Sequence, residues 1–264
     1  MALTFCSFSS GSSGNCYLVK SDRTAILIDA GISGRRILDS LKRAEVGPGD
    51  VKAVLVTHEH SDHVKSLRVI NKKLPGAVTY ANIGTWECIN GLVDEKRSIV
   101  FKTGEEFLID DIKVKAFNIL HDAAEPVGYT LSRGESKIGI LTDTGRLSEE
   151  IYEEIKEADL LVLEANHDVE MLRVGRYPWF LKQRILGEKG HLSNVDAAGA
   201  ICRLLAGGGK SRRILLAHLS RENNFPEMAY QTVKNLLEEN SCCIEKNVCI
   251  NIIEREEMSA LFTV

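Results

Sequence analysis

Three imidazoles and two carboxylates lie within one short stretch, Thr57-His58-Glu59-His60-Ser61-Asp62-His63. Borderline divalent cations bind neutral imidazole nitrogen together with carboxylate oxygen. His58 and His60 can point to one ion if the backbone is extended, which turns Asp62 and His63 toward a second position. A solvated polar turn is the alternative, but three of the seven histidines of the chain lie here. The stretch therefore predicts a metal site.

Short apolar runs on both sides of this stretch predict strands that are buried on both faces. They are Phe5–Phe8, Cys16–Val19, Thr24–Ile28, Ala53–Val56, Ile138–Leu141, Leu160–Leu163 and Ile214–Leu216. Five of the runs lead into polar residues of chemical interest, namely Asp29, Thr57 with His58, Asp143, Glu164 and His218. Buried strands that deliver reactive groups at their carboxyl ends are a common way to build a site.

Helical periodicity predicts helices over Arg35–Arg43 and Val195–Leu205, with Asn194 as the N-cap of the second. Pro226 suits the first turn of a third helix. Buried strands mixed with helices indicate an α/β fold in which helices cover the sheets.

The composition indicates one globular domain spanning residues 1–264. Hydrophobic residues make up 44% and charged residues 27%, enough to bury a sizeable core. No apolar run is long enough to span a bilayer and no signal peptide is evident, so we expect no membrane association. Seven cysteines without a C-x-x-C pair read as free thiols, which favours a cytoplasmic location.

Basic residues are concentrated in one segment of an otherwise acidic chain. The net charge is −4, yet Arg173–Arg221 carries ten Lys and Arg against two acids. A solvated basic face without function and an anion-binding surface both fit this asymmetry.

The pattern H-x-H-x-D-H after a buried strand resembles the signature of the metallo-β-lactamase superfamily. The resemblance implies an α/β fold built as a four-layer αββα sandwich, with two divalent metal ions along one edge. The implied ligands of the first metal are His58, His60 and His121. The implied ligands of the second metal are Asp62, His63 and His218, with Asp143 bridging both ions. Zinc and manganese both suit such a set of ligands.

The sequence Gly190-His191-Leu192-Ser193-Asn194 resembles the H-x-S element of nuclease members of the superfamily such as RNase Z. The resemblance implies that His191 protonates the leaving oxygen. Asp62 in the metal-binding stretch is a candidate to orient the attacking hydroxide. The alternative is a capping or loop histidine.

A basic and aromatic segment precedes this element. In Met171–Arg184 the cations Arg173, Arg176, Lys182 and Arg184 are interleaved with Tyr177, Trp179 and Phe180. Such a pattern suits nucleic acid because cations track the backbone while aromatic faces stack on bases. A packed amphipathic segment with Trp179 and Phe180 in the core is the alternative.

Arg221 follows the last implied ligand and could grip a phosphate through its planar guanidinium. It could equally be the ion-pair partner of Glu222 or of another acid.

Further motifs resemble the bacterial YycJ/WalJ group, which is associated with 5′-to-3′ exonuclease activity on DNA. They include Ser9–Cys16, Leu163–Asp168 and the segment that ends at Ser193. These motifs, together with the basic residues named above, give the candidate substrate contacts Ser12, Ser13, Asn166, His167, Arg173, Arg176, Ser193 and Arg221.

The sequence thus predicts a dinuclear-metal phosphodiesterase, a 5′-to-3′ DNA exonuclease that uses a metal-bridging hydroxide. Its expected partner is nucleic acid, either DNA ends or RNA. A small-molecule hydrolase for a cyclic phosphodiester, lactone or thioester is one alternative. A nucleic-acid-binding protein with structural metals is the other.

Overall fold

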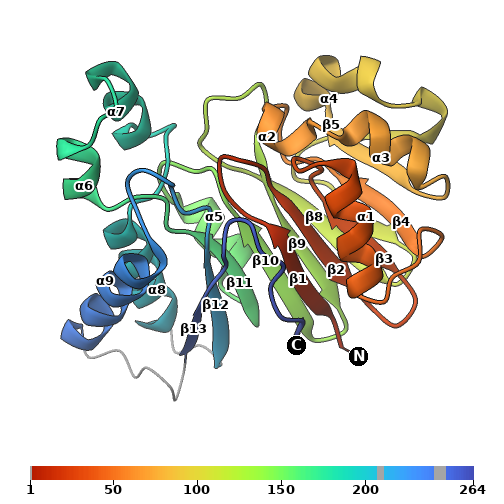
Figure 1. Ribbon diagram of the computed structural model, residues 1–264. Helices are drawn as coiled ribbons and strands as arrows, with labels where there is room; N and C mark the ends of the chain where they lie inside the picture. The colour runs from red at the N-terminus through yellow and green to blue at the C-terminus, as the bar shows by residue number, and fades with distance from the viewer. Residues whose placement is uncertain (1, 207–210, 241–247) are drawn as a thin grey trace.

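Two seven-stranded sheets pack face to face in the computed structural model, which describes residues 2–206, 211–240 and 248–264 (Figure 1). The strands of the first sheet, in spatial order, are β14 (Phe262–Thr263), β1 (Thr4–Ser9), β2 (Cys16–Lys20), β3 (Ala25–Ile28), β4 (Val51–Leu55), β5 (Val78–Asn82) and β6 (Ser98–Phe101). Those of the second sheet are β13 (Val248–Ile252), β12 (Arg212–Ala217), β11 (Leu160–Glu164), β10 (Ser136–Leu141), β9 (Val127–Arg133), β8 (Ile112–Asn118) and β7 (Glu106–Ile109).

Each sheet contains a parallel half and an antiparallel half. Strands β3 to β6 run parallel in the first sheet, and β10 to β13 run parallel in the second. Strands β1 to β3 and β7 to β10 are antiparallel. Because parallel strands end at the same edge, the two parallel halves bring several strand ends together.

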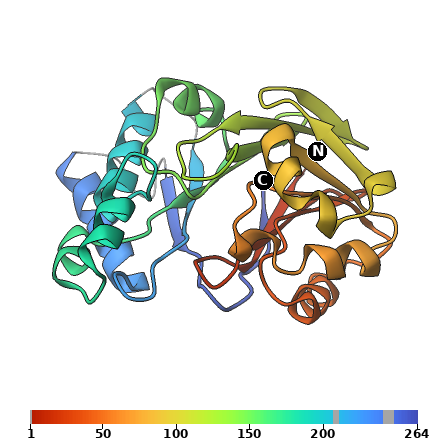
Figure 2. The same ribbon diagram turned by 90° about the horizontal axis from the view of Figure 1, so that it is seen from above.

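Helices cover the outer face of each sheet, as the view from above shows (Figure 2). The helices are α1 (Gly34–Arg43), α2 (Ser61–Val64), α3 (Leu67–Lys73), α4 (Ile83–Ile89), α5 (Glu149–Ile155), α6 (Val169–Val174), α7 (Trp179–Leu186), α8 (Asn194–Ala206) and α9 (Pro226–Glu239). Short 3₁₀ turns lie at Asn90–Leu92 and Glu95–Arg97. Within the described ranges, no helix has both the length and the apolar character needed to cross a membrane.

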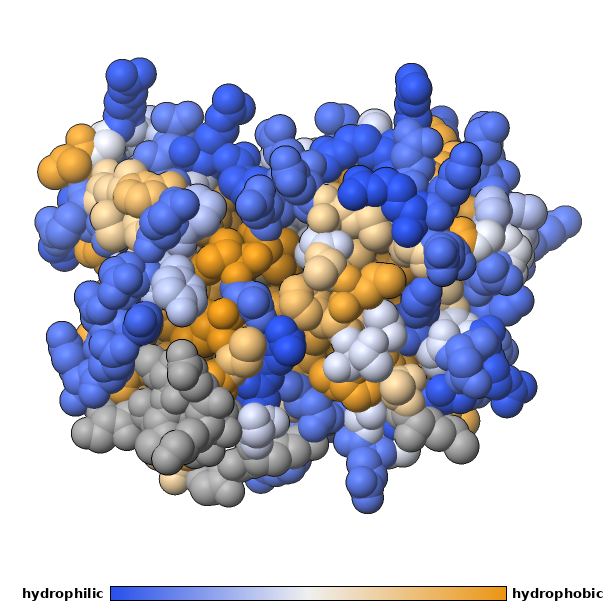
Figure 3. Space-filling model, turned by 60° about the horizontal axis from the view of Figure 1, so that its bottom comes forward, coloured by the Kyte–Doolittle hydropathy of each residue, from blue (hydrophilic) through white to orange (hydrophobic). Residues whose placement is uncertain are grey.

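Three apolar layers hold these elements together. The first lies between the sheets and includes Tyr17 and Tyr129, both fully buried. The second joins the first sheet to α1, α3 and α4, and the third joins the second sheet to α5, α8 and α9. This order of layers confirms the predicted αββα sandwich. Seen from below, apolar side chains fill the middle of the surface and hydrophilic ones the flanks (Figure 3).

The apolar runs that predicted strands all lie in strands, with ends that differ by one or two residues. The predicted helix Arg35–Arg43 is α1, and Pro226 is the first residue of α9. The predicted N-cap at Asn194 is wrong. The hydroxyl of Ser193 accepts a hydrogen bond from the backbone N–H of Asp196 at 3.1 Å, so Ser193 caps α8.

Asn194 is instead turned into the protein, because its amide exchanges hydrogen bonds with the amide of Asn224 at 3.1 and 2.8 Å. A sequence pattern alone does not distinguish these two adjacent cap candidates, since the choice depends on Asn224 from a distant segment.

Candidate metal centre

Three strand ends in the candidate site carry an unusual backbone conformation. Asp29 follows β3 with φ 62°, Asp143 follows β10 with φ 59°, and His218 follows β12 with φ 57°. Non-glycine residues seldom adopt positive φ, and such strain clusters at functional sites. At each of these positions the chain leaves its strand sharply, and the polar side chain comes to the shared edge of the two sheets.

The first group of potential metal donors consists of His58, His60 and His121, whose donor atoms lie within 4.8 Å of one another. His58 and His60 lie on the loop between β4 and α2, and His121 lies on the loop after β8. The structure therefore brings together the three residues that the sequence resemblance assigned to one ion, although His121 is far from the others in sequence.

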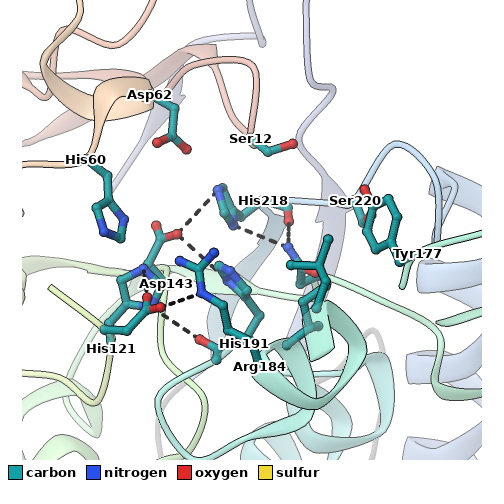
Figure 4. A pocket seen from close by; sticks show the side chains of 15 residues that line it. Ser12, His60, Asp62, His121, Asp143, Tyr177, Arg184, His191, His218 and Ser220 are labelled. Atoms are coloured by element: carbon teal, nitrogen blue, oxygen red, sulfur yellow. Dashed lines mark hydrogen bonds and ion pairs between the residues drawn. The ribbon is translucent and has the colours of Figure 1, made fainter. Parts of the chain in front are cut away.

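The second group consists of Asp62, His63 and His218, whose donor atoms also lie within 4.8 Å of one another. Asp143 approaches both groups: it clusters with His58 and His63, and its Oδ1 is 3.4 Å from Nε2 of His218. Figure 4 shows Asp143 in the middle of the pocket, among His60, His121, His191 and His218.

Two further buried carboxylates orient the imidazoles, and one of them, Glu164, also forms a group of potential donors with Asp143, His191 and His218. Oδ2 of Asp29 is 2.7 Å from Nδ1 of His63, and Oε1 of Glu164 is 2.7 Å from Nδ1 of His218. A carboxylate at Nδ1 fixes the ring and leaves Nε2 for another partner. The same function is served by the hydroxyl of Thr57, 3.0 Å from Nδ1 of His58.

Several buried donor atoms in the centre have no hydrogen-bond partner among the described residues. They are Nε2 of His58, Oδ2 of Asp143 and Nε2 of His218. Buried polar atoms of this kind are rare in folded proteins unless a ligand or ion satisfies them. The donor set of imidazole and carboxylate therefore fits divalent cations.

The charge states of His58 and Asp143 suit a cation, whereas the carboxylates of Asp29 and Asp143 outweigh burial and raise the pKa of His63 to about 10. Burial lowers the pKa of His58 well below its usual range, and the positive charge of His63 adds to the effect, so His58 is a neutral base. Burial alone would raise the pKa of Asp143, but the imidazoles of His218 and His63 hold it well below its usual range. Metal binding requires neutral imidazole and ionised carboxylate.

His191 lies beside the donor groups on the loop before α8. Its Nδ1 is 2.8 Å from Oε1 of Glu164, the oxygen that also contacts His218. Burial alone would lower the pKa of His191, but the Glu164 carboxylate outweighs it and raises this pKa to about 9. With Nδ1 held by Glu164, Nε2 is free to meet a ligand in the pocket.

One pocket of about 250 Å³ is lined by His191 and by five of the donor residues, namely His60, Asp62, His121, Asp143 and His218. The fully buried His58 and His63 lie behind this lining. Other side chains that line it include Ser12, Asp122, Asn166, Tyr177, Leu181, Arg184, Ile185 and Ser220. Two of the sequence-predicted substrate contacts, Ser12 and Asn166, are thus brought to the pocket. The amide of Asn166 donates to the backbone oxygen of His218 at 2.9 Å, which ties it to a donor residue.

The remaining predicted contacts lie outside the pocket lining. Ser13 neighbours Arg255, with 3.4 Å between its hydroxyl and the guanidinium, and the hydroxyl of Ser193 is used in capping α8. His167 is 1% exposed, and neither of its ring nitrogens has a partner among the described residues.

The predicted arginines are exposed at the surface near the pocket. Arg173 forms an ion pair with Glu170 at 2.7 Å, and Arg176 and Arg221 are also exposed. No ion pair between Arg221 and Glu222 occurs in the described residues, although the sequence left that alternative open.

Sequence reasoning gave no specific role to two buried carboxylates that shape the site. Asp29 and Glu164 were recognised as strand-end residues, and that position was the available signal for their role. Arg184 of α7 contacts Asp122 at 2.5 Å, and both line the pocket together with Tyr177. The basic and aromatic pattern in the sequence includes Tyr177 and Arg184, but it did not predict that their side chains line the pocket.

The comparison with protein families agrees with this geometry. A family model described as "Beta-lactamase superfamily domain" matches residues 24–219. The chain belongs to the metallo-β-lactamase superfamily. The match begins at β3 and ends just after His218, so it contains every donor residue described above.

Two curated relatives in this superfamily are similar over most of the chain. "Exodeoxyribonuclease YycJ" of Bacillus anthracis is 43% identical over 242 residues, which cover 90% of each chain. "Exodeoxyribonuclease WalJ" of Streptococcus pneumoniae is 41% identical over 233 residues, which cover 86% of each chain. Among solved structures, the metallo-β-lactamase fold protein YhfI from Bacillus subtilis has a TM-score of 0.75 with 14% identity over the full length of both chains. That last likeness shows the fold alone.

Superfamily membership and these relatives identify the chain as a metal-dependent hydrolase. The superfamily implies divalent metal ions, and the donor groups described above fit such ions.

Proposed function

We propose that this hydrolase is a dinuclear phosphodiesterase that degrades DNA from the 5′ end. The observation that carries the proposal is the pair of donor groups on either side of Asp143, because two neighbouring sites can clamp both oxygens of a phosphoryl transfer. Relatives that cover most of the chain are named exodeoxyribonucleases, which supports DNA as the substrate. The 5′-to-3′ polarity rests on the resemblance to the YycJ/WalJ group.

In this proposal His58, His60 and His121 would hold the first ion, Asp62, His63 and His218 would hold the second, and Asp143 would serve both. Two divalent cations there, zinc or manganese, would supply Lewis-acid stabilisation of the phosphoryl oxygens and a nucleophile at neutral pH. Asp29 and Glu164 hold the rings of His63 and His218 so that Nε2 faces the centre.

We assign the role of general acid to His191. Glu164 accepts from Nδ1 of His191 at 2.8 Å, which orients the ring and keeps a proton available on Nε2. The side chain is partly exposed to the pocket, where it can reach a leaving 3′-oxygen. Asp62 also faces this pocket and is positioned to orient the attacking water (Figure 4).

Ser12 and Asn166 are the proposed substrate contacts inside the pocket, and Arg173, Arg176 and Arg221 are proposed contacts for phosphates outside it. For Ser13, His167 and Ser193 a substrate contact remains a prediction from the resemblance. The single domain spanning residues 1–264 and the cytoplasmic location are likewise predictions from the sequence.

The test compares three substrates with one protein preparation that is stripped of metal and reloaded with Zn²⁺ or Mn²⁺. The substrates are end-labelled linear DNA with a 5′-phosphate, the same DNA with a 5′-hydroxyl, and a small chromogenic phosphodiester. We expect metal-dependent release of nucleotides from the 5′ end. His191→Ala should slow that release by about 10²–10⁴-fold, the usual contribution of a general acid.

Hydrolysis of the small diester with DNA left intact under both metals would overturn the nuclease proposal and favour a small-molecule hydrolase. Salt-sensitive DNA binding without turnover of either substrate would favour a binding protein with structural metals. Release of nucleotides from the 3′ end would overturn the proposed 5′-to-3′ polarity and leave the nuclease proposal in place.

A further inference from the structure

The segment from the end of α6 to the start of α7 carries large apolar side chains on the outside of the protein. Trp179 is 65% exposed, the adjacent Phe180 is 73% exposed, and Val174 just before them is 84% exposed. The sequence left open whether Trp179 and Phe180 lie in the core, and they do not. Exposed apolar patches of this kind mark binding surfaces.

The two rings belong to the same helix as three residues that line the pocket, although neither ring is itself part of the lining. Phe180 and Arg184 are four residues apart on α7, so they lie on the same face of the helix about one turn, or 5.4 Å, apart. Arg184 lines the pocket, as do Tyr177, Leu181 and Ile185 of the same segment. A chain that leaves the pocket along this face meets the ring of Phe180, and Trp179 is the adjacent residue at the start of the helix. In Figure 1, α6 and α7 stand beyond the strand ends at one side of the molecule.

The segment is held rigidly even though its outer face is apolar. Lys182 is buried, and its ammonium donates to the backbone oxygen of Arg173 at 2.7 Å, which ties α7 to α6. Asp168 caps α6 by accepting from the N–H of Met171 at 2.8 Å. Arg184 ties α7 to the loop of His121 through Asp122. A rigid surface loses little conformational entropy when it binds.

The surrounding charge favours a polyanion as the occupant. Arg173 and Arg176 are exposed beside the rings, in the one segment of this acidic chain that is strongly basic. Aromatic faces next to a positively charged path are the usual way to bind unpaired bases, because every base presents a π-face. A duplex buries those faces in its own stack, so the surface suits a single strand or an unpaired end.

We propose that Trp179 and Phe180 form a stacking platform for unpaired bases of the strand whose phosphate lies in the pocket. This inference rests on the proposed function, and it adds a specificity for single-stranded or frayed ends. The platform contributes to binding of the strand and makes no contact with the scissile phosphate.

Intrinsic fluorescence tests the platform directly, because the chain has two tryptophans and Trp86→Phe leaves Trp179 as the only one. This variant, free of metal so that no cleavage occurs, is titrated with an oligothymidylate and with an abasic strand of equal length. We expect the oligothymidylate to quench Trp179 and the abasic strand, which has the phosphates without the bases, to leave it unchanged.

The second arm measures binding and turnover by the double variant Trp179→Ala/Phe180→Ala. We expect single-strand affinity to fall at least about 10-fold, since stacking on an aromatic side chain contributes strongly per base. Turnover of the small phosphodiester should remain at the level of the unmodified protein. The matched control is Leu108→Ala, which removes an equally exposed apolar side chain, 68% exposed, on β7.

Equal quenching by both strands, or unchanged affinity in the double variant, would overturn the platform. Loss of a concentration-dependent dimer in the double variant, without any change in strand binding, would assign the patch to self-association instead. The two proposals fail separately: DNA cleavage without quenching removes the platform and keeps the nuclease. Quenching without cleavage of any substrate keeps the platform and removes the nuclease.

Discussion

Asp29 and Glu164 are buried carboxylates at strand ends, one in each half of the sandwich, and they organise the site in different ways. Asp29 serves one loop: it accepts from the N–H and hydroxyl of Thr57, both at 2.9 Å, and contacts His63. Glu164 joins separate segments: it contacts His191 and His218 through Oε1. Its Oε2 accepts from the N–H groups of Thr144 and Leu192, at 3.0 and 3.2 Å.

This difference implies that mutations in the two halves of the site should impair activity in different ways. Loss of Asp29 should disturb ion binding through one stretch of chain, because Asp29 holds His63 directly and His58 through Thr57. Loss of Glu164 should disturb an ion site and the proposed general acid at once. The electrostatic surroundings agree, since the two imidazoles outweigh burial and lower the pKa of Glu164 to about 2, so it is ionised at neutral pH.

Glu164→Gln should have the largest effect. The amide keeps the size of the side chain but places a donor where two imidazoles need an acceptor. We expect turnover of a small phosphodiester to fall about 10²–10³-fold, from combined loss of ligand orientation and acid catalysis. Excess metal should not restore it. Full recovery at saturating metal would show that Glu164 acts on the ion site alone.

Asp29→Asn should have a smaller effect that metal can reverse. Without the carboxylate at Nδ1 of His63, metal affinity should fall about 10–100-fold. Saturating metal should then return the rate to within a few-fold of the unmodified protein. Activity is measured against metal concentration, with metal content determined after gel filtration. A rate that stays low at saturating metal would show that Asp29, like Glu164, contributes to turnover beyond its effect on metal affinity.

Two glycines, one in each half of the site, lie so close to neighbouring backbone atoms that a larger residue does not fit. A Cβ on Gly31 would lie 1.6 Å from the backbone oxygen of Asp62, and one on Gly190 would lie 2.1 Å from that of Ile185. Each alanine variant should lose about 1–3 kcal/mol of unfolding free energy through overpacking. Gly31→Ala should also reduce metal content, while Gly190→Ala should mainly reduce turnover by displacing His191.

Denaturant unfolding and metal analysis measure both effects. Gly199→Ala in α8 is the control, because nothing lies within 4 Å of its added Cβ. Helix propensity predicts that this variant gains up to about 1 kcal/mol. If Gly31→Ala and Gly190→Ala lost the same amount of metal, the two halves of the site would not differ in their contribution to metal binding.

Helix caps should show the smallest effect and no difference between the halves. Ser33 caps α1 in the first half, where its hydroxyl accepts from Arg36 at 3.3 Å, and Ser193 caps α8 in the second. Alanine at either position should cost about 1 kcal/mol. The melting temperature should fall by about 2–4 °C in each variant. A larger loss of turnover in Ser193→Ala would show that this cap also positions the loop of His191.

The sequence by itself determined the layers of the fold and the family. Strands that are buried on both faces appear in the sequence as apolar runs. The stretch that holds His58, His60, Asp62 and His63 within six residues predicts a metal site, because residues that are neighbours in sequence are also neighbours in space. The position of Asp29 near the site could be predicted in part, since Asp29 follows such an apolar run and its partners lie in that one stretch.

Only the tertiary structure decided how the second half is assembled. Glu164 meets His191 and His218 because parallel strands far apart in the sequence end at one edge, and no local pattern records that meeting. The same reason explains the wrong N-cap, since Asn224 draws the side chain of Asn194 inward and leaves Ser193 as the cap. Exposure of Trp179 and Phe180 also depended on packing, because Lys182 and Ile185, not the aromatic rings, are the residues that α7 buries.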